Sequence, residues 1–299
     1  MPRTPVPDPG PPSTPTPRIT IRPLRTHTEY AACVALQEET WGAGFSERVP
    51  SAILKVGQRI GGITAGAFDE TGRMLGFVFG LTGVERGRLV HWSDMLAVRP
   101  EARDLGVGRR LKEYQRDVLR TLGVELIYWT YDPLVARNAH LNLNRLGARV
   151  VEYVTNMYGA ETESPLHRGI GSDRFVVAWQ ITGDEPAPPA PQPVGAVDAP
   201  VANATRIDTP DPAAAATPAA TRAADPTSTD PIALGIPLLR VEIPCDIGAV
   251  QATSLEEAAR WRHSTRHAFT TALDRGYHVT GFYRDSTEER CYYVLGTEC

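Results

Sequence analysis

Paired cysteines, long apolar runs and a strong excess of charge of either sign are all missing from this sequence of 299 residues. Its four cysteines are scattered and form no CxxC pair, so we expect reduced thiols and no disulfide framework. No apolar stretch reaches the roughly 18 residues that a membrane span needs. The first residues also lack the apolar centre of a signal peptide. We therefore expect a cytoplasmic protein that does not cross a membrane.

The net charge is only −4, and charged residues make up 22% of the chain. Such a balance gives no general attraction for nucleic acid or for an anionic membrane, so neither is expected as a partner. Any binding of an anion must then come from a local patch.

Large apolar side chains are almost absent from two segments, 1–17 and 183–230, which consist mainly of Pro, Ala, Thr and Ser. Neither segment can bury enough surface to offset its conformational entropy. We expect a disordered tail over 1–17 and a linker over 183–230. Two folded parts remain, a larger one over 18–182 and a smaller one over 231–299.

The apolar periodicity of 18–182 predicts an α/β fold with the element order βααβββαβαββ. Asp69-Glu70-Thr71-Gly72 joins two apolar runs and predicts a hairpin. Further predicted strands cover 19–25, 88–98 and 124–131, and predicted helices cover 28–41, 49–60 and 134–146. Another predicted helix carries one apolar stripe and ends at Gly123; the stripe consists of Val107, Leu111, Tyr114, Val118 and Leu122.

Closely spaced glycines stand between the strand 88–98 and this striped helix, in the sequence Arg103-Asp104-Leu105-Gly106-Val107-Gly108. A strand, a glycine-containing turn and a helix start together form a general phosphate-binding arrangement, because the helix start presents unpaired N–H groups. A Walker loop is excluded, since arginines follow Gly108 where Lys-Ser/Thr is required. A dinucleotide fingerprint is excluded as well, because its third glycine is missing.

The six residues resemble the (Arg/Gln)-x-x-Gly-x-(Gly/Ala) pyrophosphate loop of the GCN5-related N-acetyltransferases, which use acyl-coenzyme A. The order of the flanking elements is similar over roughly 165 residues. The stretches 129–140, 146–148 and 241–295 resemble a bacterial branch of this superfamily that carries an extra C-terminal segment. Relatives in that branch are thought to acylate amino acids on nitrogen, with succinyl-CoA among the donors.

The resemblance implies a mixed α/β sheet whose two central parallel strands splay apart near Val98 and Tyr131, and a C-terminal βαββ segment. It further implies that acetyl-CoA or another acyl-CoA lies in this splay, with the pantetheine arm along the first strand and the pyrophosphate at the helix start. The implied coenzyme-binding residues are Leu96, Ala97, Val98, Arg103, Asp104, Leu105, Gly106, Val107, Gly108, Arg109 and Asn138. Arg110 and Lys112 are further candidates for the ribose phosphate, although we expect Lys112 on a solvated helix face.

Attack of an amine on a thioester requires a group that takes up a proton, and the strand 88–98 offers Asp94 and His91. In a regular strand these two residues point to opposite faces, and Asp94 shares its face with Trp92 and Leu96, whereas a bulge would reverse this assignment. His140 is a third candidate. The tyrosine that relatives often use as an acid for the thiolate is absent, because Leu143 stands at that position.

The sequence therefore predicts an N-acyltransferase that acts on the amino group of a small molecule such as an amino acid. Two alternatives stay open: a non-catalytic acyl-CoA-binding or sensing module, and a protein N-acetyltransferase. His263 and His267 lie one helical turn apart but lack a third ligand, so no metal is expected. The neighbouring arginines Arg260, Arg262 and Arg266 are expected in solvent. The apolar C-terminal strands are expected to dock on the main domain or on a partner chain, which leaves a homodimer open.

Overall fold

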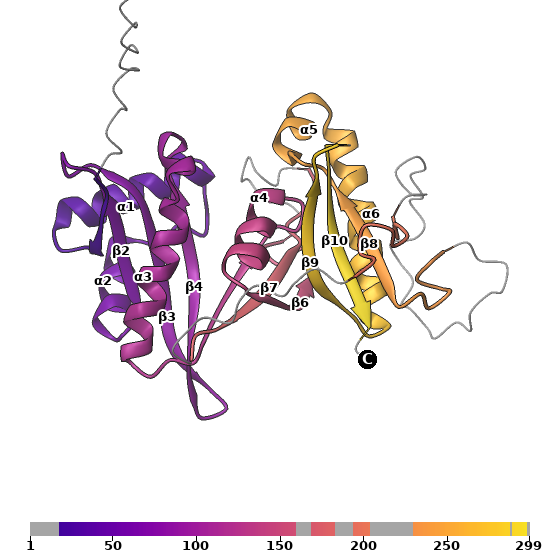
Figure 1. Cartoon of the computed structure of the whole chain (residues 1–299). Coiled ribbons are helices and arrows are strands. Elements are labelled where there is room, and N and C mark those ends of the chain that lie inside the picture. Colours follow the sequence, from indigo (N-terminus) through magenta and orange to yellow (C-terminus); the bar gives the residue numbers. More distant parts are fainter. Residues whose placement is uncertain (1–17, 160–168, 183–193, 204–229, 288, 298–299) are drawn as a thin grey trace, which may run out of the picture.

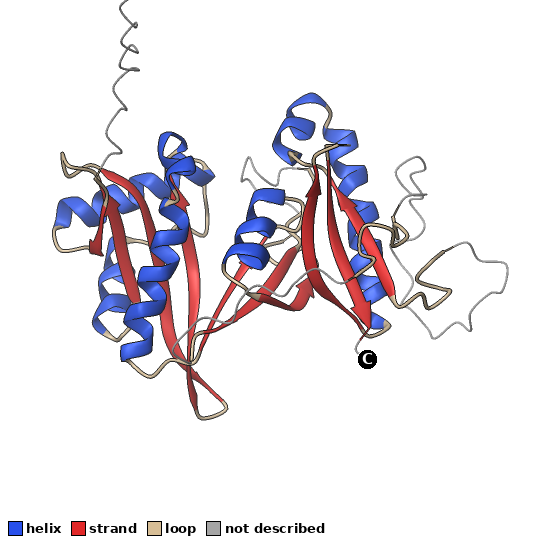
Figure 2. Ribbon diagram, in the orientation of Figure 1, coloured by secondary structure: helices blue, strands red, loops and turns tan. Residues whose placement is uncertain are grey.

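The computed structural model describes residues 18–159, 169–182, 194–203, 230–287 and 289–297. In these ranges the chain forms a seven-stranded sheet and, toward the C-terminus, a three-stranded sheet (Figure 1). Helices pack on both sheets (Figure 2). Within the same ranges, no helix combines the length and the apolar composition that a membrane crossing requires.

The large sheet has the order β1-β2-β3-β4-β5-β7-β6. Its strands are β1 (Thr20–Pro23), β2 (Ile63–Phe68), β3 (Met74–Glu85), β4 (Arg88–Val98), β5 (Leu126–Tyr131), β6 (Arg149–Val154) and β7 (Arg174–Gln180). Only the pair β4 and β5 is parallel, and the other neighbours are antiparallel. The predicted mixed sheet with an antiparallel first half is confirmed. The predicted hairpin is also present, with the Asp69 carboxylate accepting from the N–H groups of Thr71 and Arg73.

Two apolar cores cover the two faces of this sheet. One core lies under α1 (His27–Trp41) and α2 (Ser51–Arg59), and the other lies under α3 (Val107–Thr121) and α4 (Ala136–Ala139). The alternation of β2 shows the division. Thr64 donates to a carbonyl of α2, whereas its neighbours on β2 belong to the core under α3.

The centre of the sheet opens because β4 and β5 pair over only three residues each. Val90–Trp92 lies beside Leu126–Tyr128, and beyond this point the two strands separate. A bulge in β4 coincides with the separation. Phe79 of β3 lies opposite Met95 and Leu81 lies opposite Trp92, so Ser93 and Asp94 together face the single residue Gly80. The splay that the resemblance implies is therefore present.

The helix predicted over 134–146 is divided. A single turn, α4, continues as the wider turn η2 (His140–Arg145), in which the Leu146 N–H bonds to the Leu141 carbonyl. Asn144 in this turn donates to the Phe282 carbonyl of the C-terminal part, at 2.8 Å. The wide turn is thus held by a contact more than a hundred residues away in the chain, which local periodicity cannot reveal.

The C-terminal part forms the three-stranded sheet, in the order β8-β10-β9. Its elements are β8 (Leu238–Ile243), α5 (Ile247–Thr253), α6 (Leu255–Asp274), β9 (Tyr277–Asp285) and β10 (Arg290–Thr297). The strands of the predicted βαββ segment are present, but two helices replace one. The break falls at Ser254, whose hydroxyl caps α6 by accepting from the Glu257 N–H.

The C-terminal part docks firmly on the large sheet. Phe175 of β7 contacts the rings of Phe269 and Tyr293, with centroids 4.8 Å and 5.4 Å apart, and the apolar core is continuous across this junction. Part of the expected linker also packs here, because Asn203 exchanges two hydrogen bonds with the backbone of Glu242 in β8. The remaining linker residues and the tail 1–17 lie outside the described residues.

Candidate active site

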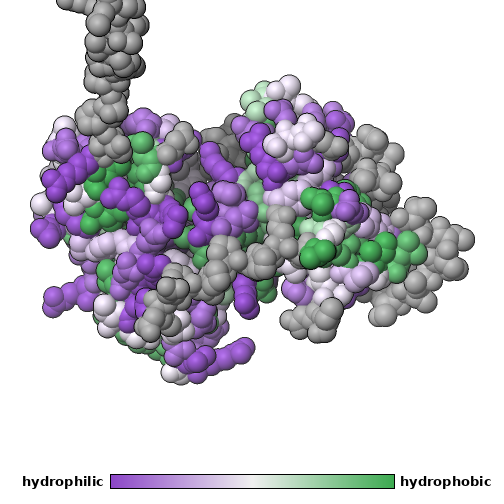
Figure 3. All heavy atoms as spheres, in the orientation of Figure 1, coloured by the Kyte–Doolittle hydropathy of each residue, from purple (hydrophilic) through white to green (hydrophobic). Residues whose placement is uncertain are grey.

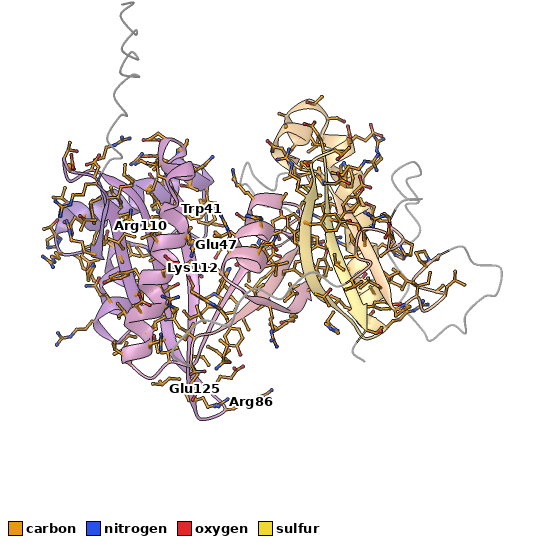
Figure 4. The ribbon with its side chains drawn as sticks, viewed as in Figure 1. Trp41, Glu47, Arg86, Arg110, Lys112 and Glu125 are labelled. Atoms are coloured by element: carbon orange, nitrogen blue, oxygen red, sulfur yellow. The ribbon has the colours of Figure 1, made fainter. Side chains whose placement is uncertain are left out.

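A cavity of about 400 Å³ lies where β4 and β5 separate. Its lining comes from β4, β5, α3, α4, η2, β7 and the loop after α1. Figure 4 shows Trp41, Glu47 and Lys112 in the part of the molecule that contains β1–β4 and α1–α3, on the side that faces α4. Hydrophilic side chains are abundant on the surface between this part and the part that contains α4 and β6–β10 (Figure 3). The cavity is large enough for a small molecule, and Leu96 in its lining lies next to Gly108 of the predicted phosphate loop.

The loop before α3 has the geometry of an anion site. Pro100–Leu105 forms the short 3₁₀ helix η1, Gly106 takes the left-handed conformation with φ +69°, and α3 begins without a side-chain cap. A Cβ on Gly108 would lie 3.6 Å from Leu96 and 3.7 Å from Val98, which are ordinary contacts. Packing therefore does not require a glycine at 108. A ligand that approaches the helix start does require one, since a side chain there would fill the space above the N–H groups.

Several arginines lie near the start of α3, and they differ in the groups with which they pair. Arg109 pairs with Glu113 at 2.8 Å on the surface, whereas Arg110 donates to the Ile19 carbonyl on the far side of α3. Arg103 reaches the Val98 carbonyl at 3.4 Å. Arg137 on α4 was not singled out from the sequence. Burial and the nearby Arg103 charge lower its pKa, and the negative charge of Asp246 opposes this shift.

The other coenzyme residues predicted on β4 and α4 are placed as follows. Leu96 and Asn138 line the cavity, and Val98 packs beside Gly108. Ala97 is buried in the core under α1, so only its main chain can serve a ligand. Leu105 is exposed and Val107 is buried in the core, while the side chain of Asp104 lies outside the described part of the chain. Beyond Trp92, no strand of the described residues pairs with β4 on its β5 side, which leaves an edge along which an extended ligand can bind.

Asp94 stands at the cavity wall on the bulge of β4. Its side chain is exposed to the cavity, yet the surrounding protein partly desolvates it and raises its pKa. A hydrogen bond from Trp92 opposes this shift, and the negative charge of Glu47 adds to it. Leu96 packs toward α3 while Met95 lies in the core under α1, so the bulge changes the alternation and the expectation that Asp94 and Leu96 share a face is wrong.

His91 does not reach the cavity. It is fully buried, with Nδ1 3.0 Å from the Thr82 hydroxyl and Nε2 3.0 Å from the Gln115 amide. Burial, together with the nearby Lys112 amino group, lowers its pKa to about 3. A Cβ on Gly80 would lie 2.3 Å from its Nε2, so the ring also dictates the glycine opposite. This geometry argues against His91 as the base and for a role in holding β3, β4 and α3 together.

Lys112 contradicts the expectation of a solvated helix face. Its side chain is only 3% exposed, and its Nζ lies 2.7 Å from the Ser93 hydroxyl and 3.8 Å from the centroid of the Trp129 ring. Both neighbours flank the point where the strands separate. The buried residues of α3 are in fact Val107, Leu111, Lys112, Gln115 and Leu119. Leu122, the last residue of the predicted stripe, is exposed, so the helix is rotated relative to that prediction.

The opposite wall is built around Asp132, directly after β5. Arg262 of α6 donates to its carboxylate at 2.6 Å, and Arg174 of β7 lies 3.7 Å away. Arg262 is only 2% exposed, and Arg266 pairs with Asp173 at 2.6 Å, so the expectation that these arginines are solvated is wrong. Tyr293 of β10 donates to the Pro133 carbonyl at 2.9 Å. The C-terminal part therefore supports one wall of the cavity directly.

Two aromatic groups complete the lining. Trp41, the last residue of α1, and Phe45 in the following loop stack with centroids 5.4 Å apart, and both line the cavity. Tyr158 was missed by the sequence analysis. Its hydroxyl lies 3.2 Å from that of Thr130, and its ring lies beside the Arg174 guanidinium. It follows β6 without any motif that would mark it.

The remaining candidates do not contribute to the cavity. Leu143 is buried, which places an apolar side chain where relatives carry a tyrosine. His140 is exposed and lies 3.3 Å from the Asn144 amide. His263 is exposed, and the described residues contain no group of three His, Cys, Asp or Glu side chains that could hold a metal ion.

The arrangement of the large sheet, with splayed β4 and β5 and a glycine loop at the start of α3, is the one that the resemblance to the GCN5-related N-acetyltransferases implies. No protein-family profile and no curated protein sequence matches the chain. Among solved structures, it is similar to the NatC complex bound to Gag peptide and CoA, with 20% identity over 55% of this chain and 99% of that one, at a TM-score of 0.43.

Two further solved structures have a comparable likeness. The ribosomal-protein-S18-alanine N-acetyltransferase from Escherichia coli is 21% identical over 56% of this chain and 97% of its own, with a TM-score of 0.42. An N-acetyltransferase from Staphylococcus aureus Mu50 is 14% identical over 55% of this chain and 99% of its own, with a TM-score of 0.43.

Proposed function

We propose that this protein is an acyl-CoA-dependent N-acyltransferase that acylates the amino group of a small molecule, such as an amino acid. The observation that carries the proposal is the junction of three features at one place: the separated strands, the uncapped start of α3 behind two glycines, and a cavity that contains a carboxylate. Acetyl-CoA is the simplest donor, and succinyl-CoA is a second candidate.

The coenzyme part of the site uses main-chain groups and guanidinium groups. The first N–H groups of α3 bind the pyrophosphate, and Arg103 and Arg137 contribute positive charge on either side. The free edge of β4 beyond Trp92 pairs with the pantetheine amides. Asn138, which lines the cavity from α4, faces the same arm.

The acceptor part of the site lies on the side of Asp94, Glu47 and the aromatic pair of Trp41 and Phe45. An amine is protonated near neutral pH and must lose a proton before it attacks a thioester. Asp94 accepts that proton in our proposal, and its raised pKa makes it a stronger base than an ordinary carboxylate. The two acidic side chains also attract an ammonium group. In our proposal the stacked rings form one wall of the acceptor pocket, and a cavity of about 400 Å³ favours a small acceptor over an extended peptide.

The test is a turnover assay with acetyl-CoA and succinyl-CoA as donors and a panel of amino acids, simple amines and N-terminal peptides as acceptors. The assay measures the free CoA thiol that is released. We expect transfer to at least one small amine and a loss of about 100-fold or more in Asp94→Asn. Binding of CoA without turnover on any amine would instead support the non-catalytic module. The reason for considering this module is Leu143, an apolar residue at the position expected for the tyrosine acid. Transfer to peptides alone would support a protein N-acetyltransferase.

A further inference from the structure

Lys112 is the most unusual charged residue of the cavity. It comes from the second turn of α3, reaches between the separated strands and is almost completely buried. Its amino group has two close neighbours, the Ser93 hydroxyl at 2.7 Å and the face of the Trp129 ring. Ser93 itself sits on the bulge of β4 and lines the cavity as well. A long polar side chain is thus connected to the cavity through one hydroxyl group.

No carboxylate compensates this amino group within the described residues. Burial alone accounts for the lowering of its pKa, without a contribution from an acidic neighbour. The nearest acidic group on the opposite wall, Asp132, is engaged by Arg262. A buried amine without a counter-ion favours its neutral form, which can accept a proton. The other titratable or charged groups that line the cavity are Asp94, Glu47, Tyr131, Asp132, Tyr158 and Arg174, and His91 lies near Lys112 without reaching the cavity.

The chemistry of the proposed reaction contains a proton transfer for which no group has yet been assigned. A protonated amine loses two protons on its way to an amide. The first leaves before attack, and the second leaves the nitrogen after the new C–N bond has formed. When the C–S bond breaks, the sulfur departs as a thiolate and gains one proton. A group that takes the second proton from nitrogen and delivers it to sulfur ends the cycle in its starting state.

We propose that Lys112, acting through the Ser93 hydroxyl, is the proton-transfer pair that carries this second proton from the adduct nitrogen to the departing sulfur. This inference rests on the proposed function. Ser93 donates its hydroxyl proton to sulfur and recovers one from the Lys112 ammonium, which formed when neutral Lys112 took the nitrogen proton. Charge and protons balance in each turnover, and Asp94 retains the separate task of deprotonating the incoming amine.

The first test needs no variant of the site and no activity. The chain has only two lysines, Lys55 and Lys112. Protein labelled with ¹³C at lysine Cε therefore gives two resonances, which Lys55→Met assigns. We expect the Lys112 resonance to show an amine that loses its proton well below the pH at which an ordinary lysine does, because burial lowers its pKa. A Lys112 amine that is still fully protonated at pH 9 would overturn the proposal.

The second test measures kinetics. Lys112→Met and Ser93→Ala should each lower kcat by about 100-fold while the affinity for CoA changes less than about threefold. The acidic limb of the wild-type kcat profile that reports the neutral lysine should disappear in Lys112→Met and remain in the matched control Lys55→Met. An unchanged kcat and pH profile in Lys112→Met, in a wild type that does transfer acyl groups, would refute the pair. Failure of the wild type to bind acyl-CoA would instead refute the proposed function, and the resonance measurement would still decide the state of Lys112.

Discussion

The two walls of the cavity differ in how their charged groups are held. On the wall formed by β5 and β7, Asp132 is fixed by Arg262 and lies near Arg174, and the C-terminal part supplies the dominant contact. On the wall formed by β4 and α3, Asp94 and Lys112 form no ion pair with each other or with any other described residue. Paired charges mark the wall that holds the fold together, and unpaired charges mark the wall that meets the substrate in our proposal.

The largest effect is expected from removing the ion pair between Arg262 and Asp132 on the wall formed by β5 and β7. Arg262→Ala leaves the buried Asp132 carboxylate without its main partner, and we expect a loss of about 3 kcal/mol in the free energy of unfolding. Chemical denaturation measures it. Arg260→Ala is the matched control on the same helix, because Arg260 makes a partly exposed pair with Glu256 and should cost less than about 0.5 kcal/mol. Equal effects of the two variants would mean that Asp132 and Arg262 do not form a structural clamp.

A second prediction concerns His91 of β4, which we expect to stabilise the fold and to have no role in the cavity. The folded state lowers the pKa of His91 from 6.5 to about 3, so protonation favours the unfolded chain. Stability from this residue is present above pH 6.5 and is lost as the pH falls toward 3, by about 2 kcal/mol between pH 7 and pH 5.

His91→Gln keeps hydrogen-bonding groups near Thr82 and Gln115 but does not titrate. Denaturation midpoints from pH 7 to pH 5 should therefore fall less steeply in this variant than in the wild type, while acyl transfer is retained. The same pH slope in both proteins, or abolished transfer in a folded variant, would contradict the assignment of His91 to the fold.

The smallest expected effect concerns the surface of α3. Arg109→Ala removes an exposed pair with Glu113 and should change stability by less than about 0.5 kcal/mol. The dissociation constant for CoA should nevertheless rise about fivefold, since a guanidinium at the helix start is lost. Arg110→Ala is the control, because Arg110 points to the Ile19 carbonyl and should leave CoA binding unchanged. Calorimetric titration of CoA into both variants at two salt concentrations measures the two dissociation constants. Equal dissociation constants for Arg109→Ala and Arg110→Ala would contradict the prediction.

Much of the fold could be predicted because its signals are local. The hairpin at Asp69, the helix that ends at Gly123 and the glycines before α3 each depend on the backbone preferences of a few neighbouring residues. The position of the loop that we propose binds the coenzyme follows from the same local rules. The stripe of α3 was predicted less well. This helix covers the gap between two separating strands, so its buried arc is set by tertiary packing and includes Lys112.

The rest of the site depends on contacts between distant segments. The pair of Asp132 and Arg262 joins residues 130 positions apart, on either side of the segment 183–230 that has few large apolar side chains. The bulge at Ser93 and Asp94 arises where β4 leaves β5, and no residue type marks it in advance. Cys245 and Cys291 are a further case, since their sulfur atoms lie 2.7 Å apart although the sequence spacing shows no pair.

The central claim, that the start of α3 binds coenzyme A, is tested most directly by titrating CoA into the wild type and into Gly108→Glu in a calorimeter. A Cβ at position 108 fits without a clash, so the variant should keep the unfolding midpoint of the wild type. Its carboxylate would occupy and repel the pyrophosphate. The account predicts saturable binding to the wild type and none to the variant. Equal binding to both proteins, or no binding to the wild type at saturating CoA, would contradict it.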